Sequence, residues 1–302
     1  MSENLVLKEP RTLSEDLSPV GPIAFGLWRY TTEKLEEATE LLETAIELGM
    51  NLIDNADVYG FDWGGKGFGA CEELLGKVIA AKPHLRDQIV LSTKGGIAPP
   101  VPYNSSSNYL RSACEGSLKR LGVENIDLYQ IHRADLYTHP SEVAETLDSL
   151  IDEGKIKAVG VSNYTPDQVS ALSSYLKSPL VTTQPEFSVN CLKPLRDGTL
   201  DQCSAKGINP LAWSPLAGGR LATGEGIRPE LVELLDELGQ RELVDRATIA
   251  VAFVLAHPTA PIPIVGTQRT ERLRKLSEAT SVNLNRDDVY NLIEASDGVP
   301  LP

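Results

Sequence analysis

Eight short apolar segments, each followed by a stretch with helical periodicity, set the pattern of this sequence. The segments are residues 23–27, 51–54, 89–94, 126–132, 158–162, 181–185, 209–213 and 262–265. Short apolar runs that alternate with amphipathic stretches predict an α/β protein with a parallel sheet. Eight such units fit a closed (β/α)₈ barrel, the TIM barrel, better than an open sheet. Periodicity alone leaves a doubly wound open sheet as the alternative.

Signals at the ends of the intervening helices support this interpretation. Thr32 is the expected N-cap of the first helix, and Gly49 is expected to end it in a left-handed conformation. Thr165 and Gln168 predict a capping box, with a proline between them at the first helical position. Residues 108–121 place their apolar side chains on one side of a helix. Helices of this kind are expected to cover a buried sheet.

The chain is predicted to be a single domain comprising residues 1–302. A barrel of this class uses about 250 residues as one unit, so the length of the chain is compatible with one barrel. No linker, low-complexity tract or shift in composition divides the sequence, and the proline-rich stretch 98–102 lies inside one strand–helix unit. With 41% hydrophobic and 23% charged residues, the composition is that of an ordinary globular protein.

Charge and cysteine content exclude several classes of function. The chain has 28 Lys and Arg against 42 Asp and Glu, and its net charge of −14 opposes general attraction to nucleic acid or anionic lipid. The four cysteines form no CxxC pair and have no histidine at metal-ligand spacing, which predicts reduced thiols without a metal site. The first ten residues are polar, and no run of about 18 apolar residues occurs. We therefore expect a cytoplasmic protein.

Four ionisable residues are expected to meet at one end of the barrel, because functional groups of such barrels lie at the carboxyl ends of the strands. Asp54, Lys94 and His132 end the second, third and fourth apolar segments, and Tyr59 follows Asp54 closely. Each residue alone is compatible with an ordinary role as a turn cap, core side chain, solvated charge or loop histidine. Together they suit proton donation, because a phenol titrates near ~10 unless a nearby cation stabilises its phenolate. Lys94 could be that cation, with Asp54 as its counter-charge and His132 orienting a carbonyl group.

A partial phosphate-binding motif points to a different class of function. The segment from Gly60 to Lys66 matches GxxxxGK of a P-loop, but Gly67 follows where a Ser or Thr is needed for Mg²⁺. No GxGxxG follows the first strand, which argues against a Rossmann dehydrogenase. We expect instead a flexible active-site loop that carries Trp63 and Phe68 towards a substrate. A P-loop NTPase remains the alternative.

Further motifs are spread along the chain. In order, they read NLIDNADVYG, ACEELLGKVI, VLSTKGG, DLYQIHRAD, GKIKAVGVSNYT, TQPEFS, LAWSPLAGGRL and IPIVGTQRTERLRKL. Over nearly its whole length the chain thus resembles the aldo-keto reductase superfamily. The resemblance implies a (β/α)₈ barrel with a catalytic tetrad. In this tetrad Tyr59 is the acid, Lys94 and Asp54 lower its pKa, and His132 positions the carbonyl.

The resemblance also implies a nicotinamide cofactor across the barrel mouth. Ser162, Asn163 and Gln184 would bind the carboxamide of the nicotinamide. Trp213 would stack on the nicotinamide ring, at a position where Tyr is commoner in the family. Two glycines in the next loop would let backbone N–H groups approach the pyrophosphate. The residues implied for this loop are Ser214, Pro215, Leu216, Gly218, Gly219 and Arg220.

The last strand–helix unit is implied to bind the 2′-phosphate and adenine of NADPH. Arg272 is the expected guanidinium partner of the phosphate, at the start of a helix that opens near residue 270. The Glu-Asn pair that usually contacts adenine is replaced by Lys275 and Leu276. The residues implied for this site are Gly266, Thr267, Gln268, Arg269 and Arg272. NADPH is expected in preference to NADH.

The predicted function is reduction of an aldehyde or ketone to an alcohol by hydride transfer, with Tyr59 as general acid and no metal ion. Its expected partner is a small carbonyl or alcohol substrate, without nucleic acid or membrane. Four aromatic residues in loops after the first three strands are expected to contact it: Trp28, Tyr30, Trp63 and Tyr103. The alternatives are a sugar or alcohol dehydrogenase that works in the oxidative direction, and a non-catalytic, cofactor-sensing regulatory subunit.

Overall fold

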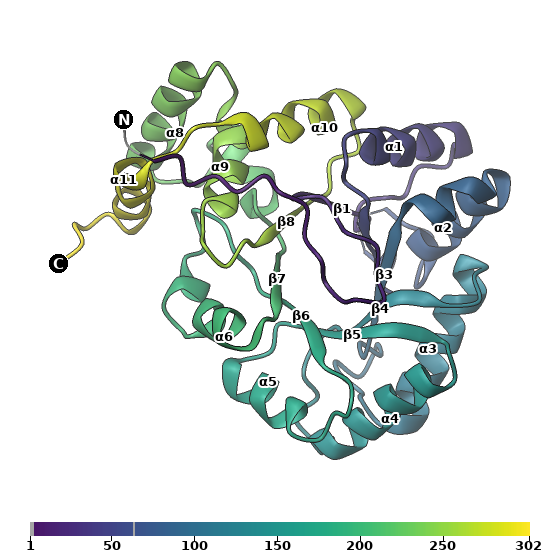
Figure 1. The fold of residues 1–302 in the computed structure, drawn as a ribbon. Coiled ribbons are helices and arrows are strands. Elements are labelled where there is room, and N and C mark those ends of the chain that lie inside the picture. The colour runs from purple at the N-terminus through teal and green to yellow at the C-terminus, as the bar shows by residue number, and fades with distance from the viewer. Residues whose placement is uncertain (1–2, 63) are drawn as a thin grey trace.

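A computed structural model describes residues 3–62 and 64–302, and its strands form a closed barrel (Figure 1). Each strand is parallel to the next, and the last closes the ring on the first through the register pair Phe25 and Val265. This closure confirms the (β/α)₈ barrel and rules out the open sheet. The strands are β1 (Ala24–Gly26), β2 (Leu52–Asp54), β3 (Val90–Gly95), β4 (Ile126–Ile131), β5 (Ile156–Ser162), β6 (Leu180–Gln184), β7 (Asn209–Ala212) and β8 (Ile262–Val265).

Helices surround this barrel on its outer side (Figure 1). The α-helices are α1 (Leu35–Glu47), α2 (Ala70–Ala81), α3 (Ser107–Leu121), α4 (Pro140–Asp152), α5 (Pro166–Ser173), α6 (Thr199–Lys206), α7 (Arg220–Thr223), α8 (Pro229–Glu242), α9 (Arg246–Leu255), α10 (Thr270–Ser277) and α11 (Arg286–Asp297). Short 3₁₀ helices are η1 (Pro83–Gln88), η2 (Lys193–Leu195), η3 (Ala217–Gly219) and η4 (Glu278–Ser281). In the part of the chain that is described, no helix is both long enough and apolar enough to cross a membrane.

The helix-end signals predict some boundaries and miss one. The capping box of Thr165 and Gln168 is formed at the start of α5. Gly49 has φ +77° directly after Leu48, the C-cap of α1, as predicted. The predicted N-cap at Thr32 is wrong, because α1 begins only at Leu35. The hydroxyl of Thr32 instead accepts the backbone N–H two residues later and forms a turn before the helix.

Alternate residues of the strands contribute to two apolar regions. Outward-facing side chains such as Phe25, Ile53 and Leu91 pack against the helices. Inward-facing side chains near the amino ends of the strands form a second cluster with Leu13 and Leu17 of the N-terminal segment. Because apolar groups fill this end of the barrel, the polar interior residues are gathered towards the carboxyl ends of the strands.

Candidate active site

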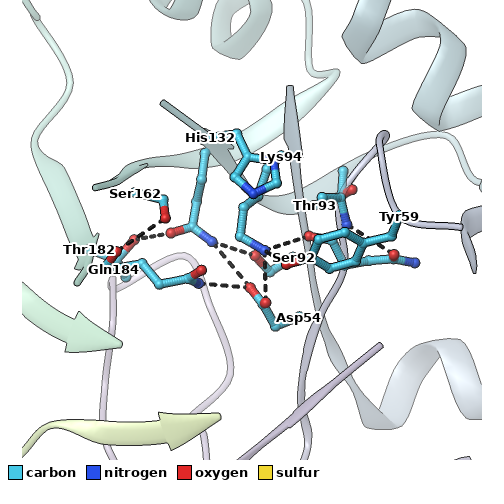
Figure 2. Close-up of polar contacts among 12 residues, drawn as sticks. Asp54, Tyr59, Ser92, Thr93, Lys94, His132, Ser162, Thr182 and Gln184 are labelled. Atoms are coloured by element: carbon cyan, nitrogen blue, oxygen red, sulfur yellow. Dashed lines mark hydrogen bonds and ion pairs between the residues drawn. The ribbon is translucent and has the colours of Figure 1, made fainter. Parts of the chain in front are cut away.

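The carboxyl ends of β2, β3 and β4 bring the four predicted catalytic residues together (Figure 2). Asp54 is the last residue of β2, Lys94 lies next to the last residue of β3, and His132 directly follows β4. Tyr59 comes from the turn after β2, and its phenol ring points back towards Lys94 (Figure 2). The structure therefore brings these four side chains together, as their positions at or near the ends of the predicted strands led us to expect.

Backbone hydrogen bonds explain how Tyr59 reaches this position. After β2 the chain turns across the end of β3, where the N–H of Asn55 donates to the carbonyl of Ser92 and the N–H of Asp57 donates to the carbonyl of Lys94. These two bonds, of 2.9 and 3.0 Å, continue the pairing with β3 beyond the end of β2. The turn is thus fixed to the same strand that carries the lysine.

Lys94 is at the centre of the site. Its Nζ donates to Asp54 Oδ2 at 2.7 Å, to the carbonyl of Asn55 at 2.7 Å and to Tyr59 Oη at 3.2 Å. All three donors of the ammonium group are therefore used, although the side chain has no exposed surface. Burial opposes the charge on Lys94, but Asp54 and Tyr59 together hold its pKa above the ordinary value. Lys94 is a buried cation at neutral pH.

The electrostatics of Tyr59 differ from the sequence-based expectation. Burial raises the pKa of this phenol above its ordinary value, and the charge of Lys94 opposes that effect without reversing it. The negative charge of Asp54 itself raises the pKa of Tyr59. Asp54 therefore favours the phenolate only indirectly, by holding the Lys94 ammonium group in place. At neutral pH Tyr59 is a protonated phenol beside a fixed cation.

His132 lies beside the phenol ring. The two rings meet edge to face, with 5.8 Å between their centroids and an angle of 79° between their planes. Burial, followed by the charge of Lys94, holds the pKa of His132 well below its ordinary value. Its Nδ1 is buried and has no hydrogen-bond partner among the described residues. The neutral imidazole thus has unused hydrogen-bonding capacity next to Tyr59.

The residues implied for nicotinamide binding form a connected group. Trp213 Nε1 donates to Asn163 Oδ1 at 3.0 Å, and Asn163 Nδ2 donates to Ser162 Oγ at 2.9 Å. Gln184 Nε2 donates to Asp54 Oδ1 at 2.9 Å. This last contact, which sequence reasoning missed, connects the group to the charged site.

The loop after β7 has a different geometry from the one expected. Gly218 and Gly219 have φ values of +71° and +104°, and a Cβ added at either would meet no described atom within 4 Å. However, the N–H of Gly218 donates to Ser214 Oγ, and the N–H of Gly219 donates to the carbonyl of Leu216. What the glycines provide is therefore an open surface without side chains rather than free N–H groups. Arg220 follows them and is exposed.

The segment after β8 leads into α10, which begins at Thr270 as predicted. Gly266, Thr267 and Gln268 are partly buried, and Arg272 is exposed on the first turn of the helix. The Oε1 atom of Gln268 is buried and accepts no hydrogen bond from the part of the chain that is described. A buried acceptor without a donor fits a site where a ligand supplies the missing hydrogen bond.

The predicted substrate contacts are in different environments. Trp28 and Tyr103 are 42% and 37% exposed. Tyr30, in contrast, has no exposed surface, because its ring packs in the core and its hydroxyl donates to the carbonyl of Ala38. The structure therefore does not support Tyr30 as a substrate contact. Trp63 lies outside the described residues.

The described residues of the segment that resembles a P-loop, 60–62 and 64–67, make contacts within the protein. The N–H of Gly67 donates back to the carbonyl of Gly60, and Lys66 pairs with Glu33 at 3.1 Å on the surface. Phe68, at the end of the segment, is 38% exposed. Phe61 is also exposed, and sequence reasoning did not single it out.

Comparisons with known proteins agree with this geometry. Residues 22–297 match the model of the Aldo/keto reductase family. A 6-dehydroglucose reductase of Novosphingobium aromaticivorans is 45% identical over 295 residues, which are 97% of each chain. An L-glyceraldehyde 3-phosphate reductase of Escherichia coli is 29% identical over 293 residues, covering 85% of this chain and 83% of that one.

A solved structure gives the same result at the level of the fold. The crystal structure of a thermostable aldo-keto reductase in complex with the inhibitor epalrestat has a TM-score of 0.81 and 26% sequence identity, and the match covers 95% of this chain and 99% of that chain. The family generally uses nicotinamide cofactors and reduces carbonyl compounds. The chain therefore belongs to the aldo/keto reductase family of oxidoreductases.

Proposed function

We propose that this protein reduces an aldehyde or ketone to an alcohol with NADPH, using Tyr59 as the general acid. The observation that carries the proposal is the position of the Lys94 ammonium group, which bridges Asp54 and the Tyr59 hydroxyl at the carboxyl ends of the strands. A general acid must be protonated before the reaction and must be able to lose its proton during it. The raised pKa of Tyr59 meets the first requirement, and the adjacent cation meets the second.

The residues have distinct roles in this proposal. The Tyr59 hydroxyl donates its proton to the carbonyl oxygen as negative charge develops there, and Lys94 stabilises the phenolate that remains. Asp54 keeps Lys94 charged and in place. The neutral imidazole of His132 donates a hydrogen bond to the same carbonyl oxygen. When bound, the reduced nicotinamide supplies the hydride to the carbonyl carbon.

The cofactor assignment rests on chemistry at two places. Ser162, Asn163 and Gln184 present amide and hydroxyl groups that suit a carboxamide, and the indole of Trp213 is fixed beside them by its bond to Asn163. At the other end, exposed guanidinium groups on α10 suit the 2′-phosphate that distinguishes NADPH from NADH. We therefore propose NADPH as the preferred cofactor.

The proposed substrate is a sugar-derived aldehyde. The 6-dehydroglucose reductase that is 45% identical to this chain over 97% of both lengths supports this class. The exposed rings of Trp28 and Tyr103 could cover the apolar face of a sugar ring. We further propose a cytoplasmic location, which agrees with four cysteines that form no disulfide.

A kinetic assay with both cofactors tests the proposal. The purified protein is given NADPH or NADH with 6-dehydroglucose, glyceraldehyde 3-phosphate and 4-nitrobenzaldehyde, and absorbance at the nicotinamide band is followed. We expect multiple turnovers with NADPH and the highest kcat/KM for 6-dehydroglucose. Tight cofactor binding without turnover would favour a cofactor-sensing subunit. Faster oxidation of the corresponding alcohol would favour a dehydrogenase.

A further inference from the structure

A polar layer crosses the interior of the barrel at the level of Lys94. Lys94 on β3 is the register partner of Gln130 on β4, Gln130 is the partner of Gly160 on β5, and Gly160 is the partner of Thr182 on β6. Lys94, Gln130 and Thr182 have no exposed surface. Register partners on adjacent strands point to the same face of a sheet, so these side chains share the interior with the catalytic lysine.

The amide of Gln130 joins this layer to Asp54. Its Nε2 donates to Ser92 Oγ at 3.0 Å and lies 3.4 Å from Asp54 Oδ1, and its Oε1 accepts from Thr182 Oγ1 at 3.3 Å. Gln184 Nε2 donates to the same Oδ1 atom of Asp54 at 2.9 Å. The two oxygens of Asp54 therefore have separate partners. Oδ1 faces two neutral amides, and Oδ2 faces the Lys94 ammonium group.

Gly160 leaves the space in the barrel interior that the side chains of Gln130 and Thr182 occupy. A Cβ at this position would approach Thr182 Oγ1 to 2.0 Å and Gln130 Cγ to 3.0 Å. Gly160 is not among the glycines with positive φ, so its backbone conformation does not require glycine. The requirement is steric: the contact between Gln130 and Thr182 occupies the volume that a side chain at residue 160 would fill.

We propose that Gln130 is a positioning residue for carbonyl reduction, which acts by holding Asp54 with Oδ2 turned towards Lys94. The inference rests on the proposed function. An amide suits this role because it satisfies a buried carboxylate oxygen without adding a charge that would compete for Lys94. A small displacement of Asp54 would shift Lys94 relative to the Tyr59 hydroxyl, and misplacement by about 1 Å costs up to ~10²-fold in rate.

The direct test is Gln130→Met, which keeps the length of the side chain and removes its hydrogen bonds. We expect kcat to fall about 10-fold, with KM for the carbonyl substrate and for NADPH within about 2-fold of the wild type. The matched control is Gln202→Met on α6. Gln202 Nε2 donates to the carbonyl of Pro166 and to Ser170 Oγ, on the outer side of the barrel. This control should leave kcat unchanged.

A double-mutant cycle separates positioning of Asp54 from a merely structural role. If Gln130 acts through the carboxylate, Gln130→Met should change kcat by less than about 2-fold in an Asp54→Asn background. A full 10-fold loss in both backgrounds would overturn the inference. If Gln130→Met does not fold, Thr182→Val removes only the partner of the amide oxygen. Thr182→Val should lower kcat about 2- to 3-fold in the wild-type background and should have no effect on kcat in the Asp54→Asn background.

The outcomes distinguish this inference from the proposed function. Wild-type kcat in Gln130→Met, together with an inactive Tyr59→Phe variant, would contradict the role of Gln130 and leave the proposed function intact. Wild-type kcat in Tyr59→Phe would contradict the proposed function itself.

Discussion

Lys94 shows how individual residues of this site depend on one another. Its charge is held in a fully buried position by one carboxylate, one backbone carbonyl and one phenol. A buried charge that loses its partner is costly, so Asp54 and Lys94 stabilise each other as well as the site. The charge of the same ammonium group lowers the pKa of Tyr59 and so opposes the effect of burial. The function proposed for the phenol therefore depends on the lysine.

Replacing Lys94 by methionine tests this dependence. Lys94→Met keeps the length of the side chain and removes the charge, so the pKa of Tyr59 should rise further and the phenolate should become harder to form. We expect kcat to fall at least ~10²-fold with little change in the Kd of NADPH. Stopped-flow turnover and fluorescence titration would measure the two quantities on the folded fraction of the variant. A kcat close to that of the wild type would contradict the role assigned to Lys94.

Asp57 provides a test of electrostatics that does not depend on activity. Its carboxyl group has no exposed surface, and neither oxygen has a well-formed hydrogen bond among the residues described. Burial, and then the charge of Glu72, raise the pKa of Asp57 well above its ordinary value. An acid with a raised pKa in the folded state destabilises the fold as pH rises from its unfolded pKa, near ~3.9, towards the folded value.

The variant Asp57→Asn should therefore gain stability relative to the wild type as pH increases. The gain is at most about 1.4 kcal/mol per pH unit, because the uncharged amide avoids the proton release that accompanies unfolding of the wild type. Denaturant unfolding of both proteins at pH 5, 6 and 7 would measure the difference. A difference that is independent of pH would show that Asp57 is ionised in the folded protein.

Sequence patterns predict the residues at strand ends better than those inside the barrel or in loops. Asp54, Lys94 and His132 stand out because each is a polar residue that ends an apolar segment. Gln130 does not stand out, because it lies inside such a segment and the sequence pattern does not show which side chains it contacts. Tyr30 is mispredicted as a substrate contact because its distance from a strand end along the chain does not show which way its ring points.

At the level of elements, the strands agree with the sequence more closely than the start of α1 does. The predicted segment 262–265 coincides with β8, because Pro261 and Gly266 flank this short apolar run and mark both of its ends. The start of α1 is shifted from the predicted cap, because Thr32 can satisfy a backbone N–H in a turn as well as at a helix end. Local hydrogen bonds of this kind cannot be distinguished by sequence pattern.

Helix α10 carries a prediction about cofactor choice. Arg272 is exposed on its first turn, where the positive end of the helix also favours an anion. A charge-assisted hydrogen bond contributes about 1.5 to 3 kcal/mol, so Arg272→Ala should weaken NADPH binding by roughly 10- to 100-fold and barely change NADH binding. Fluorescence titration with both cofactors would measure the change.

The matched control on the same helix is Arg274→Ala. Arg274 is in the last turn of α10, and its Nη2 lies 3.4 Å from Oε2 of Glu47 on α1. Removal of its guanidinium group should therefore change the binding of neither NADPH nor NADH. Equal weakening of NADPH and NADH in Arg272→Ala would mean that Arg272 supports the helix or another part of the cofactor.

In the whole molecule, the inner apolar cluster and the polar side chains of the candidate site lie at opposite ends of the barrel. Apolar side chains fill the amino end, and the charged and amide side chains lie towards the carboxyl end, where loops from different strands meet. Closure of this barrel could not be predicted with certainty from periodicity, because the pattern of each strand does not identify its partner. The pairing of β8 with β1 decides between a closed barrel and an open sheet.

The net charge of the whole chain also affects the binding of a phosphorylated cofactor. A net charge of −14 repels a phosphorylated cofactor, so binding requires a local group of basic residues. Arg269, Arg272 and Lys275, on and just before α10, are the exposed candidates. Because such contacts are screened by salt, we expect the proposed preference for NADPH over NADH to decrease as ionic strength rises.

Steady-state turnover of the wild type and of Tyr59→Phe is the most direct test of the account. Both proteins would be assayed with NADPH and the same aldehyde, and their Kd for NADPH would be measured in parallel. The phenyl ring preserves packing and removes only the proton donor, so kcat should fall at least ~10²-fold while the Kd stays within about 2-fold. A Tyr59→Phe variant that turns over at nearly the wild-type rate would contradict Tyr59 as the general acid.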